Sequence, residues 1–387
     1  MDFGFTDEEE KLRAEVREFL RKELTPEAIA ETRANGGNYG GPEGRKVIRK
    51  LGARGWLVPT WPRKYGGLES SHMVEYVIRT ELVYAGLPWV FVGANMAGPT
   101  ILEYASEELT DEFLPKIAKG EIELTLGYTE PQAGSDLAAI EIRAEDKGDY
   151  FLLNGQKMFN TSAHIADYHW LGARTEPGAR HRGISLMLVD LKSPGITIRP
   201  MVTMAGWKTN EIFYDDVQVP KRNMVGEKNH GFYYIMSALD LERMFPVDSY
   251  LRLFEELVEY AKETKRNGKP LSKDPVIRQR LAQVAIELEV SRLLYYQLAD
   301  ILDKGKIPNY QSSMEKVFAT ETCQRVANTG MQIMGLYGQL HEDSKRSLLE
   351  GKVEHYYRWP VVETIYAGTS EIQRNIIALR GLGLPTH

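Results

Sequence analysis

Residues 121–136 read EIELTLGYTEPQAGSD, and the pattern of the sequence changes there. Upstream of this stretch, apolar residues recur at the spacing of amphipathic helices. From Glu121 onward, short apolar and β-branched runs alternate with turn residues instead. Residues 124–128 predict a strand, and the small polar residues of TEPQAGSD lie where that strand ends. This stretch therefore predicts a β domain that follows a helical one.

Residues 1–120 predict the helical N-terminal domain. Apolar residues fall at helical spacing over residues 7–24. Thr6 is the expected N-cap of this helix, and Glu9 completes a capping box with it. Further helices are expected over residues 44–54, 71–85, 94–105 and 109–119.

Residues 121–230 predict a small antiparallel barrel or sandwich. Within residues 150–159 (YFLLNGQKMF), Asn154 and Gly155 separate two apolar runs, which is a strong hairpin signal. Further strands are expected over residues 184–191, 196–201 and 212–219.

Residues 231–387 return to the helical period. Pro275 can occupy the first turn of a long helix that has a wide apolar face. Long helices with short connections favour a four-helix bundle. The predicted fold class is therefore α+β and multidomain, with helices, a β domain and a bundle in that order. Further helices of the bundle domain are expected over residues 312–334, 344–357 and 371–382.

Composition argues against several functions. The 387 residues carry 48 Lys and Arg against 54 Asp and Glu, and this net charge of −6 gives no reason to expect nucleic-acid binding. A single cysteine, Cys323, argues against a disulfide framework and a multi-thiolate metal site. No run of about 18 apolar residues occurs, so no membrane span is expected. The acidic N-terminus resembles neither a secretory signal nor a transit peptide, and a cytoplasmic location is expected.

Several common chemical motifs are missing from the sequence. His, Asp and Glu show no metal-ligand spacing, so no metal site is expected. There is no G-x-S-x-G, Walker or Gly-rich Rossmann motif, which disfavours a nucleophilic hydrolase and a nicotinamide enzyme.

TEPQAGSD could hold a ligand at the end of its strand. Gly134 lets a ligand approach the backbone, and Thr129 and Ser135 offer hydroxyls. The N–H groups of such a turn suit a phosphate or an electron-rich heterocycle. The residues alone favour a plainer interpretation, which is an ordinary capped turn.

The segment KMFNTS, residues 157–162, ends the second run of the expected hairpin. Phe159 could stack on a flat cofactor while Thr161 binds its edge. The plainer interpretation is an aromatic residue of the β core beside a polar strand end.

Two further polar segments lie in the C-terminal domain. In YAGTSEIQR, Gly368 permits a sharp bend, Thr369 or Ser370 can cap the next helix, and Glu371 lies in its first turn. In DLER, residues 240–243, an acid and a base are adjacent. A capping turn and a solvated helix face are the plain interpretations.

Together, five segments resemble the acyl-CoA dehydrogenase family in content, order and spacing. They are TEPQAGSD, NGQKMFNTS, LDLER, QIMGLYG and IYAGTSEIQR, and the resemblance covers about residues 3–384. In that family an N-terminal helical domain, a central β domain and a C-terminal four-helix bundle hold FAD. Members are usually tetramers in which two subunits contact each FAD.

The resemblance implies binding roles for individual residues. Phe159 takes the place of a Trp that lies against the flavin ring, and Thr161 that of a Thr near flavin N5. The residues expected to bind FAD are Tyr128, Thr129, Gly134, Ser135, Phe159, Thr161, Gln332, Gly335, Thr369 and Glu371. Those expected to bind the acyl-CoA are Ser135, Asp240, Arg243, Tyr366 and Gly368.

The reaction implied is α,β-dehydrogenation of an acyl-CoA thioester. In the family, a carboxylate takes the α-proton, a hydride passes from Cβ to flavin N5, and electron-transfer flavoprotein accepts the electrons. The thioester oxygen needs donors aimed at it. The resemblance implies a flavin ribityl hydroxyl and the backbone N–H of Ala367.

The position of the usual base departs from the family. That base is a Glu just before Gly-Thr, and Ala367 stands there instead, with a methyl group that cannot accept a proton. Some members, including isovaleryl-CoA dehydrogenase, carry the base on another helix, and Glu242 matches that position. We hypothesise that Glu242 is the base; the alternative is a solvated helix residue. A base at this position goes, in the family, with branched or long acyl groups. Aromatic residues such as Tyr84 and Tyr366 could line a pocket for a cyclic or branched acid, although a core role is the plainer interpretation for most of them.

Three smaller departures also occur. Gln132 stands where the family motif usually has Gly, and Trp359-Pro360 replaces Asp-Ala before the last motif. Residues 262–277 lack the Arg that reaches the neighbouring subunit's FAD, for which Lys265 or Arg266 could substitute.

Two other functions fit the same fold. One is a flavin monooxygenase or nitroalkane-oxidase-like enzyme, which Arg243 and the intact YAGTSEIQR segment disfavour. The other is a catalytically silent FAD- or CoA-binding subunit of a hetero-oligomer, which Ala367 keeps open. A homotetramer and a heterotetramer with a related subunit both remain open.

Overall fold

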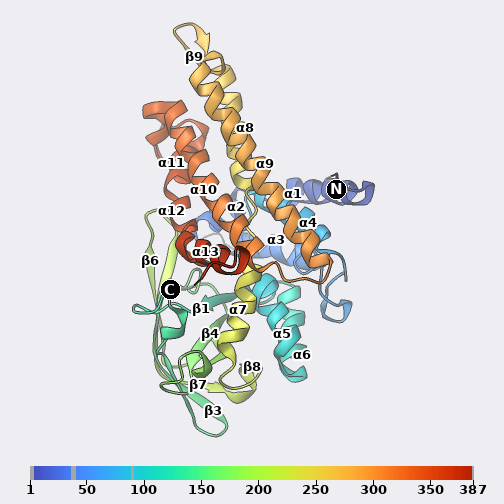
Figure 1. The fold of residues 1–387 in the computed structure, drawn as a ribbon, viewed down its shortest axis with the longest axis vertical. Helices are drawn as coiled ribbons and strands as arrows, with labels where there is room; N and C mark the ends of the chain where they lie inside the picture. Colours follow the sequence, from blue (N-terminus) through green and yellow to red (C-terminus); the bar gives the residue numbers. More distant parts are fainter. Residues whose placement is uncertain (1–3, 36–40, 89–90, 386–387) are drawn as a thin grey trace. The chain divides into compact units, whose positions relative to one another are not determined.

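The computed structural model describes residues 4–35, 41–88 and 91–385, apart from the side chains of residues 240–242. The chain divides into two compact units, Met1–Glu75 with Val90–Glu242 and Tyr76–Trp89 with Arg243–His387. Along the chain, helices come first, then strands, then helices again (Figure 1). The predicted α–β–α order is therefore confirmed.

The first unit begins with helix α1 (Asp7–Glu23). The Thr6 hydroxyl accepts from the Glu9 N–H at 3.2 Å, and the Thr6 N–H donates to Glu9 Oε2 at 2.7 Å. The predicted capping box is therefore confirmed, and it satisfies two N–H groups that a helix start leaves without partners. The other α-helices of this unit are α2 (Pro26–Ala34), α3 (Pro42–Gly52), α5 (Gly98–Tyr104), α6 (Glu107–Ala118) and α7 (Gly231–Glu242).

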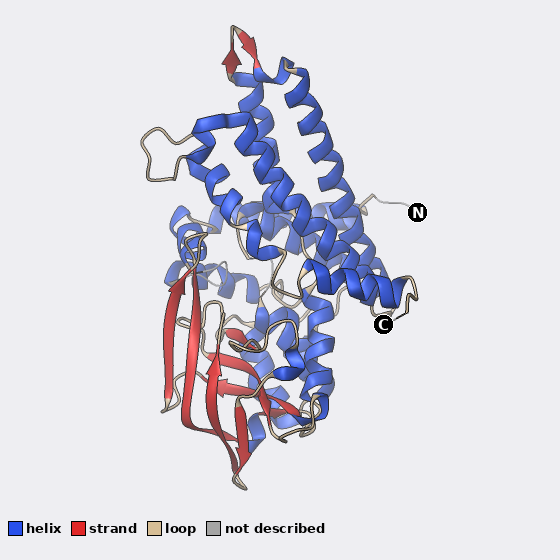
Figure 2. Ribbon diagram, turned by 60° about the vertical axis from the view of Figure 1, so that its left-hand side comes forward, coloured by secondary structure: helices blue, strands red, loops and turns tan. Residues whose placement is uncertain are grey.

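The β domain is one eight-stranded sheet in the order β6-β7-β3-β2-β4-β5-β8, with β1 paired to β4 (Figure 2). Most pairs are antiparallel, but β1 runs parallel to β4, as does the start of β2. The strands are β1 (Leu124–Gly127), β2 (Arg143–Asp146), β3 (Tyr150–Lys157), β4 (Tyr168–Arg174), β5 (Ile184–Asp190), β6 (Ile196–Val202), β7 (Lys208–Pro220) and β8 (Met224–Val225).

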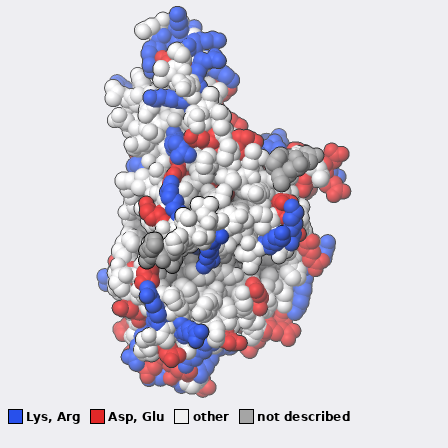
Figure 3. All heavy atoms as spheres, viewed as in Figure 1, with Lys and Arg blue, Asp and Glu red and all other residues white. Residues whose placement is uncertain are grey.

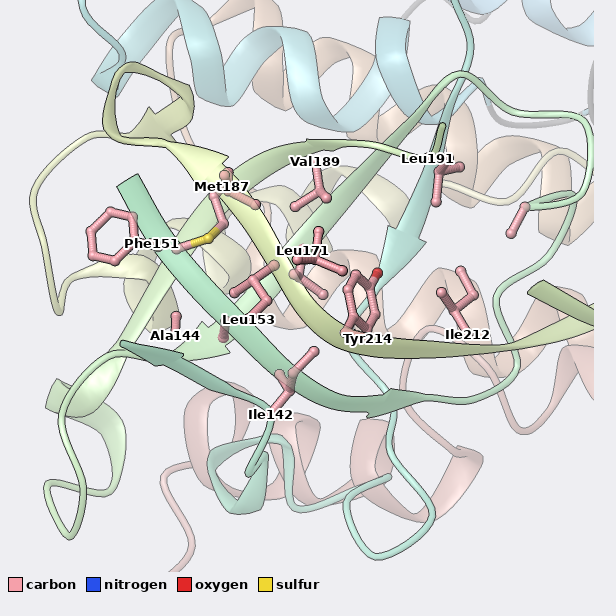
Figure 4. Packing of buried hydrophobic residues seen from close by; sticks show 14 of the residues in the cluster. Ile142, Ala144, Phe151, Leu153, Leu171, Met187, Val189, Leu191, Ile212 and Tyr214 are labelled. Carbon is pink, nitrogen blue, oxygen red and sulfur yellow. The ribbon is translucent and has the colours of Figure 1, made fainter. Parts of the chain in front are cut away.

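The curved sheet encloses an apolar core (Figure 4). Leu153, Leu171, Met187 and Ile212 come from four different strands and are fully buried in it. Burial of this kind supplies most of the favourable free energy of folding. The packed sheet therefore provides a rigid scaffold for the loops at the ends of its strands.

The predicted hairpin at Asn154 and Gly155 is wrong. Strand β3 runs through both residues, with a bulge between Leu153 and Gly155. The Asn154 side chain donates to Asp216 Oδ1 at 2.9 Å and accepts from the Asp216 N–H at 3.0 Å, so its partner is β7. Gly155, with a φ of +140°, absorbs the bulge instead of forming a turn. Pairing with β2 and β7 on both sides overrides the local turn signal.

The second unit is a bundle built around helix α10 (Asn309–Met334), which contacts α8 (Asp248–Glu263) and α9 (Pro275–Asp303). Asp274 caps α9 by accepting from the Val276 N–H at 2.9 Å. The short strands β9 (Lys265–Arg266) and β10 (Lys269–Pro270) join α8 to α9 as a hairpin. The remaining α-helices are α4 (His72–Ala85), whose first residues belong to the other unit, α11 (Lys352–Arg358), α12 (Pro360–Glu363) and α13 (Ser370–Ile376).

Two predicted helices of this unit are shorter than expected. The helix expected over residues 344–357 begins only at Lys352, because Glu350 and Gly351 adopt the left-handed conformation, with φ angles of +55° and +70°. A Cβ at Gly351 would lie 2.5 Å from the Glu342 backbone nitrogen, so the preceding loop packs too closely for a helix to continue. The last helix is α-helical only to Ile376, and a π-turn follows it.

Candidate active site

TEPQAGSD forms a tight turn directly after β1. Glu130 and Ala133 exchange two backbone hydrogen bonds, at 3.0 and 3.1 Å. A Cβ added at Gly134 would meet nothing within 4 Å, and Ser135 is exposed. A ligand can therefore approach the backbone of this turn from one side.

A buried ion pair holds the turn in place. Lys157 Nζ lies 2.8 Å from Glu130 Oε1 and donates to the Tyr128 carbonyl at 2.9 Å. The Glu130 carboxylate also accepts from the backbone N–H groups of Glu141 at 2.6 Å and Ile142 at 3.0 Å. Burial lowers the pKa of Lys157 to about 8, against the attraction of Glu130. Glu130 belongs to TEPQAGSD and Lys157 to KMFNTS, but nothing in either segment predicts that the two side chains meet.

The segment that carries Phe159 and Thr161 follows β3 and runs alongside β1 and Thr129. The Met158 N–H donates to the Thr129 carbonyl at 2.9 Å, and the Thr125 hydroxyl donates to the Thr161 carbonyl at 2.5 Å. Phe159 has a φ of +59°, and 59% of its surface is exposed. The plainer interpretation of Phe159 as a core aromatic is therefore wrong. An exposed ring on a left-handed backbone offers a flat face for stacking.

Tyr128 lies differently from its neighbours in the motif. Its side chain is buried, and its hydroxyl accepts from Trp170 Nε1 at 2.8 Å. Its backbone carbonyl is the one that binds Lys157. Tyr128 therefore belongs to the support of the turn, and its predicted contact with the cofactor stays a prediction.

In the second unit, the turn at Ala367 and Gly368 leads into α13. Thr369 caps that helix by accepting from a backbone N–H at 3.3 Å, as predicted. Gln373 Nε2 donates to the Ala367 carbonyl at 2.6 Å, and Lys316 Nζ donates to the Gly368 carbonyl at 2.9 Å. Gln373 belongs to the YAGTSEIQR segment. Lys316 lies on α10, and nothing in the sequence around it predicts a contact with this turn.

The other predicted residues of this unit occupy varied positions. Gln332 is exposed in the last turn of α10, and Gly335, with a φ of +59°, ends that helix with no atom within 4 Å of an added Cβ. Glu371 is exposed in the first turn of α13, where backbone hydrogen bonding lowers its pKa. Tyr366 is half-buried, and Arg243 is buried. An open glycine beside an exposed amide is compatible with binding of a ligand there.

Asp240 and Glu242 lie in the last turn of α7, which ends at Glu242. Their side chains lie outside the described part of the chain. The proposed base role of Glu242 and the proposed substrate contact of Asp240 therefore stay predictions.

Another carboxyl lies four residues before Ala367. Glu363 is 2% exposed, and Tyr250 Oη lies 2.9 Å from both of its oxygens. Burial raises the pKa of Glu363 to about 8. Because both oxygens are engaged inside the bundle, we assign Glu363 to the core and not to the chemistry.

Lys265 and Arg266 are exposed on the hairpin between α8 and α9, at the basic end of this unit (Figure 3). Together with Lys262, Lys269 and Lys273 they form a basic tip. Such a tip attracts anions. Within the described residues, no group of three or more His, Cys, Asp or Glu could hold a metal ion, and no helix is long and apolar enough to cross a membrane.

Comparison with known proteins places the chain in a family. Models of the acyl-CoA dehydrogenase N-terminal, middle and C-terminal domains match residues 6–121, 125–217 and 229–382. The chain is 37% identical to acyl-CoA dehydrogenase FadE26 of Mycobacterium tuberculosis, over 100% of this chain and 99% of that protein. It is 33% identical to the caffeyl-CoA reductase-Etf complex subunit CarC of Acetobacterium woodii, over 97% and 98%.

Among solved structures, the "Tcur3481-Tcur3483 steroid ACAD" has a TM-score of 0.92 and 35% identity, with 100% of both chains covered. The chain therefore belongs to the acyl-CoA dehydrogenase family, whose members are FAD-dependent flavoproteins. It is an oxidoreductase that acts on acyl-CoA, and its cofactor is FAD.

Proposed function

We propose that the protein oxidises the Cα–Cβ bond of an acyl-CoA thioester, with Glu242 as the base that takes the α-proton. The observation that carries the proposal is the turn at Ala367. Its carbonyls are held by internal donors, while the Ala367 side chain is a methyl group. The turn therefore keeps a backbone N–H for the thioester oxygen but has no carboxylate for the proton.

Glu242 and the Ala367 N–H would act in the same step, the removal of the α-proton. When Glu242 removes the α-proton, negative charge develops on the thioester oxygen, and a preorganised N–H stabilises that charge. Bound FAD supplies the acceptor for the hydride. A general base works best when the surroundings exclude water and bring its pKa toward the working pH.

The residues of the described chain fit FAD. The exposed Phe159 ring offers a stacking face, and Gly134 and Gly335 leave their backbones open to a ligand. We assign Thr129, Ser135, Phe159 and Thr161, together with Tyr128 and Gly134, to the flavin and its pyrophosphate. We assign Gln332, Gly335, Thr369 and Glu371 to the adenosine half.

We propose that the acyl group is bulky, either branched or polycyclic. Likeness to a steroid ACAD at 35% identity over the whole chain supports this, and so does the absence of the usual base at Ala367. Tyr366 and Gly368 would border the acyl group, and Asp240 and Arg243, together with Ser135, would contact the CoA arm.

We further propose that electron-transfer flavoprotein reoxidises the enzyme, within a tetramer. The likeness to a subunit of an Etf complex supports the acceptor. The two-protein name of the steroid ACAD supports a heterotetramer with a related subunit over a homotetramer. The basic hairpin at Lys265 and Arg266 would then reach an anionic group of a neighbouring subunit.

The test is to purify the protein, measure its flavin content and add acyl-CoA thioesters with straight, branched and polycyclic acyl groups. We expect flavin bleaching by at least one thioester, and loss of bleaching in Glu242→Gln. The matched control is Glu263→Gln, because Glu263, like Glu242, is the last residue of its helix; the Glu263 side chain is exposed, and its replacement should leave bleaching unchanged.

Other outcomes identify the other functions. Near-normal bleaching by Glu242→Gln would remove Glu242 as the base. Oxygen-dependent turnover without bleaching would favour a monooxygenase. A protein without flavin and without bleaching, which regains both only with a partner subunit, would favour the silent subunit that Ala367 leaves open.

A further inference from the structure

The turn at Ala367 and Gly368 has two consecutive left-handed residues. The φ angles are +53° and +86°. A left-handed backbone is unfavourable for a residue that carries a Cβ, so the surrounding contacts must impose it on Ala367. A Cβ at Gly368 would lie 2.4 Å from Gln373 Nε2, so the close approach of that side chain requires a glycine there.

Two buried side chains hold this turn from outside it. Gln373 on α13 is fully buried and donates to the Ala367 carbonyl at 2.6 Å. Lys316 on α10 is 1% exposed and donates to the Gly368 carbonyl at 2.9 Å. Burial of an ammonium group costs more free energy than burial of a neutral donor. A neutral donor could hold the Gly368 carbonyl at a lower cost, so the buried Lys316 indicates a role beyond stabilising the turn.

The peptide before the turn is fixed as well. The Tyr366 N–H donates to the Val362 carbonyl at 3.1 Å, so Ala367 is held on both sides. Among the residues that the structure describes, the Ala367 N–H donates to no internal acceptor. A fixed backbone N–H without an internal partner is what an oxyanion site requires.

We propose that Lys316 and Gln373 are positioning residues that aim the Ala367 N–H at the thioester oxygen of the acyl-CoA. This inference rests on the proposed function. Neither side chain exchanges a proton with the substrate. Lys316 holds the Gly368 carbonyl, and Gln373 holds the Ala367 carbonyl and, at 3.4 Å, the Gly368 carbonyl as well. The N–H therefore does not have to reorient when charge develops on the thioester oxygen.

The variants Lys316→Met and Gln373→Met remove one donor each and keep a side chain of similar length. The matched control is Gln324→Met. Gln324 also lies on α10 and donates to the Pro360 carbonyl at 3.0 Å and to the Thr364 hydroxyl at 3.2 Å. It thus holds the same C-terminal segment but not the turn itself.

Each holoenzyme is tested with the thioester that bleaches the wild-type flavin fastest. Three quantities are measured: exchange of the α-protons with deuterated solvent, the rate of flavin bleaching, and the Kd of free CoA. Free CoA has no thioester oxygen, so its affinity reports on the rest of the binding site. Lys316→Arg keeps a charged donor and serves as the conservative variant.

We expect exchange and bleaching to fall about tenfold to a hundredfold in both Met variants, because a displaced donor stabilises the developing charge less. The Kd of free CoA should stay within about twofold, and Lys316→Arg should recover part of the rate. Gln324→Met should match the wild type in all three measurements.

Rates in the two Met variants equal to those of Gln324→Met would overturn the proposal. A loss of affinity for free CoA as large as the loss of rate would overturn the proposal too, because it would indicate general damage to the binding site. If Lys316→Met does not fold, Gln373→Met and Lys316→Arg decide by the same criteria. A wild-type protein that neither holds flavin nor exchanges α-protons would instead contradict the proposed function.

Discussion

Tyr250 Oη lies 2.9 Å from each carboxylate oxygen of Glu363, and this pair joins α8 to α12 inside the bundle. Both residues are buried, and burial raises the pKa of Glu363 from 4.5 to about 8. A carboxyl group in this position favours its protonated form. The pair therefore makes the stability of the bundle depend on pH.

Replacement of Glu363 should reveal this dependence. Because the folded pKa lies above the unfolded one, the contribution of Glu363 is fully present below 4.5 and is lost as the pH rises toward about 8. Each pKa unit corresponds to about 1.4 kcal/mol. Glu363→Gln should therefore unfold with a flatter pH dependence than the wild type across this window.

Urea unfolding at several pH values between the two pKa values measures the difference. Glu259→Gln is the control, because Glu259 is exposed on α8 and its loss should leave the wild-type slope unchanged. Parallel pH curves for the wild type and Glu363→Gln would contradict the prediction.

Lys157→Met should destabilise the β domain and loosen the TEPQAGSD turn. The change leaves the Glu130 charge buried without its cation, which costs roughly 3–5 kcal/mol. We expect a lower Tm and less bound flavin after purification. The double variant Lys157→Met/Glu130→Gln should recover part of the stability, because no charge is then buried.

An exposed pair gives the control for this prediction. Lys147 lies 2.6 Å from Glu145 at the surface of the same domain, and Lys147→Met should change the free energy of unfolding by less than about 1 kcal/mol. The idea fails if both lysine variants have the same Tm.

Gly127→Ala should destabilise the protein through His169. An added Cβ would lie 2.4 Å from His169 Nε2, and the His169 ring is fully buried. Overpacking of this kind destabilises a protein by roughly 1–3 kcal/mol. Gly134→Ala is the matched control for stability, since its Cβ meets nothing within 4 Å. Equal free energies of unfolding for the two variants would show that the ring moves aside freely.

Phe159→Ala should weaken FAD binding and leave folding unaffected. The ring is 59% exposed, so its removal leaves no cavity in the core. Loss of one stacking partner is expected to raise the Kd of FAD about threefold to tenfold. Flavin fluorescence titration of the apoprotein measures that Kd, and thermal unfolding of the apoprotein checks the fold.

Tyr233→Ala is the control for Phe159, because Tyr233 is also an exposed aromatic residue of the first unit. It should change neither the Kd of FAD nor the Tm. An unchanged FAD affinity in Phe159→Ala would remove Phe159 from the flavin site.

The sequence alone was sufficient for features that depend on residues close together in the chain. The capping box at Thr6, the cap at Thr369 and the turn after β1 each involve residues a few positions apart. The order of helices and strands follows from hydrophobic periodicity, which is also local. The absence of a carboxylate at position 367 can be read directly from the sequence, because an alanine stands there.

Tertiary packing decided the features whose partners are far apart. The Asn154-Gly155 signal is typical of a hairpin, yet pairing with β7 keeps β3 extended through it. Lys157 is buried against Glu130, and nothing in the local pattern of either residue marks that contact.

Lys316 reaches a carbonyl 52 positions away, and Tyr250 reaches Glu363 over 113 positions. Local patterns determine which face of an element is apolar. The folded chain determines which buried polar groups meet, because an ion or donor removed from water must find its partner wherever packing places one.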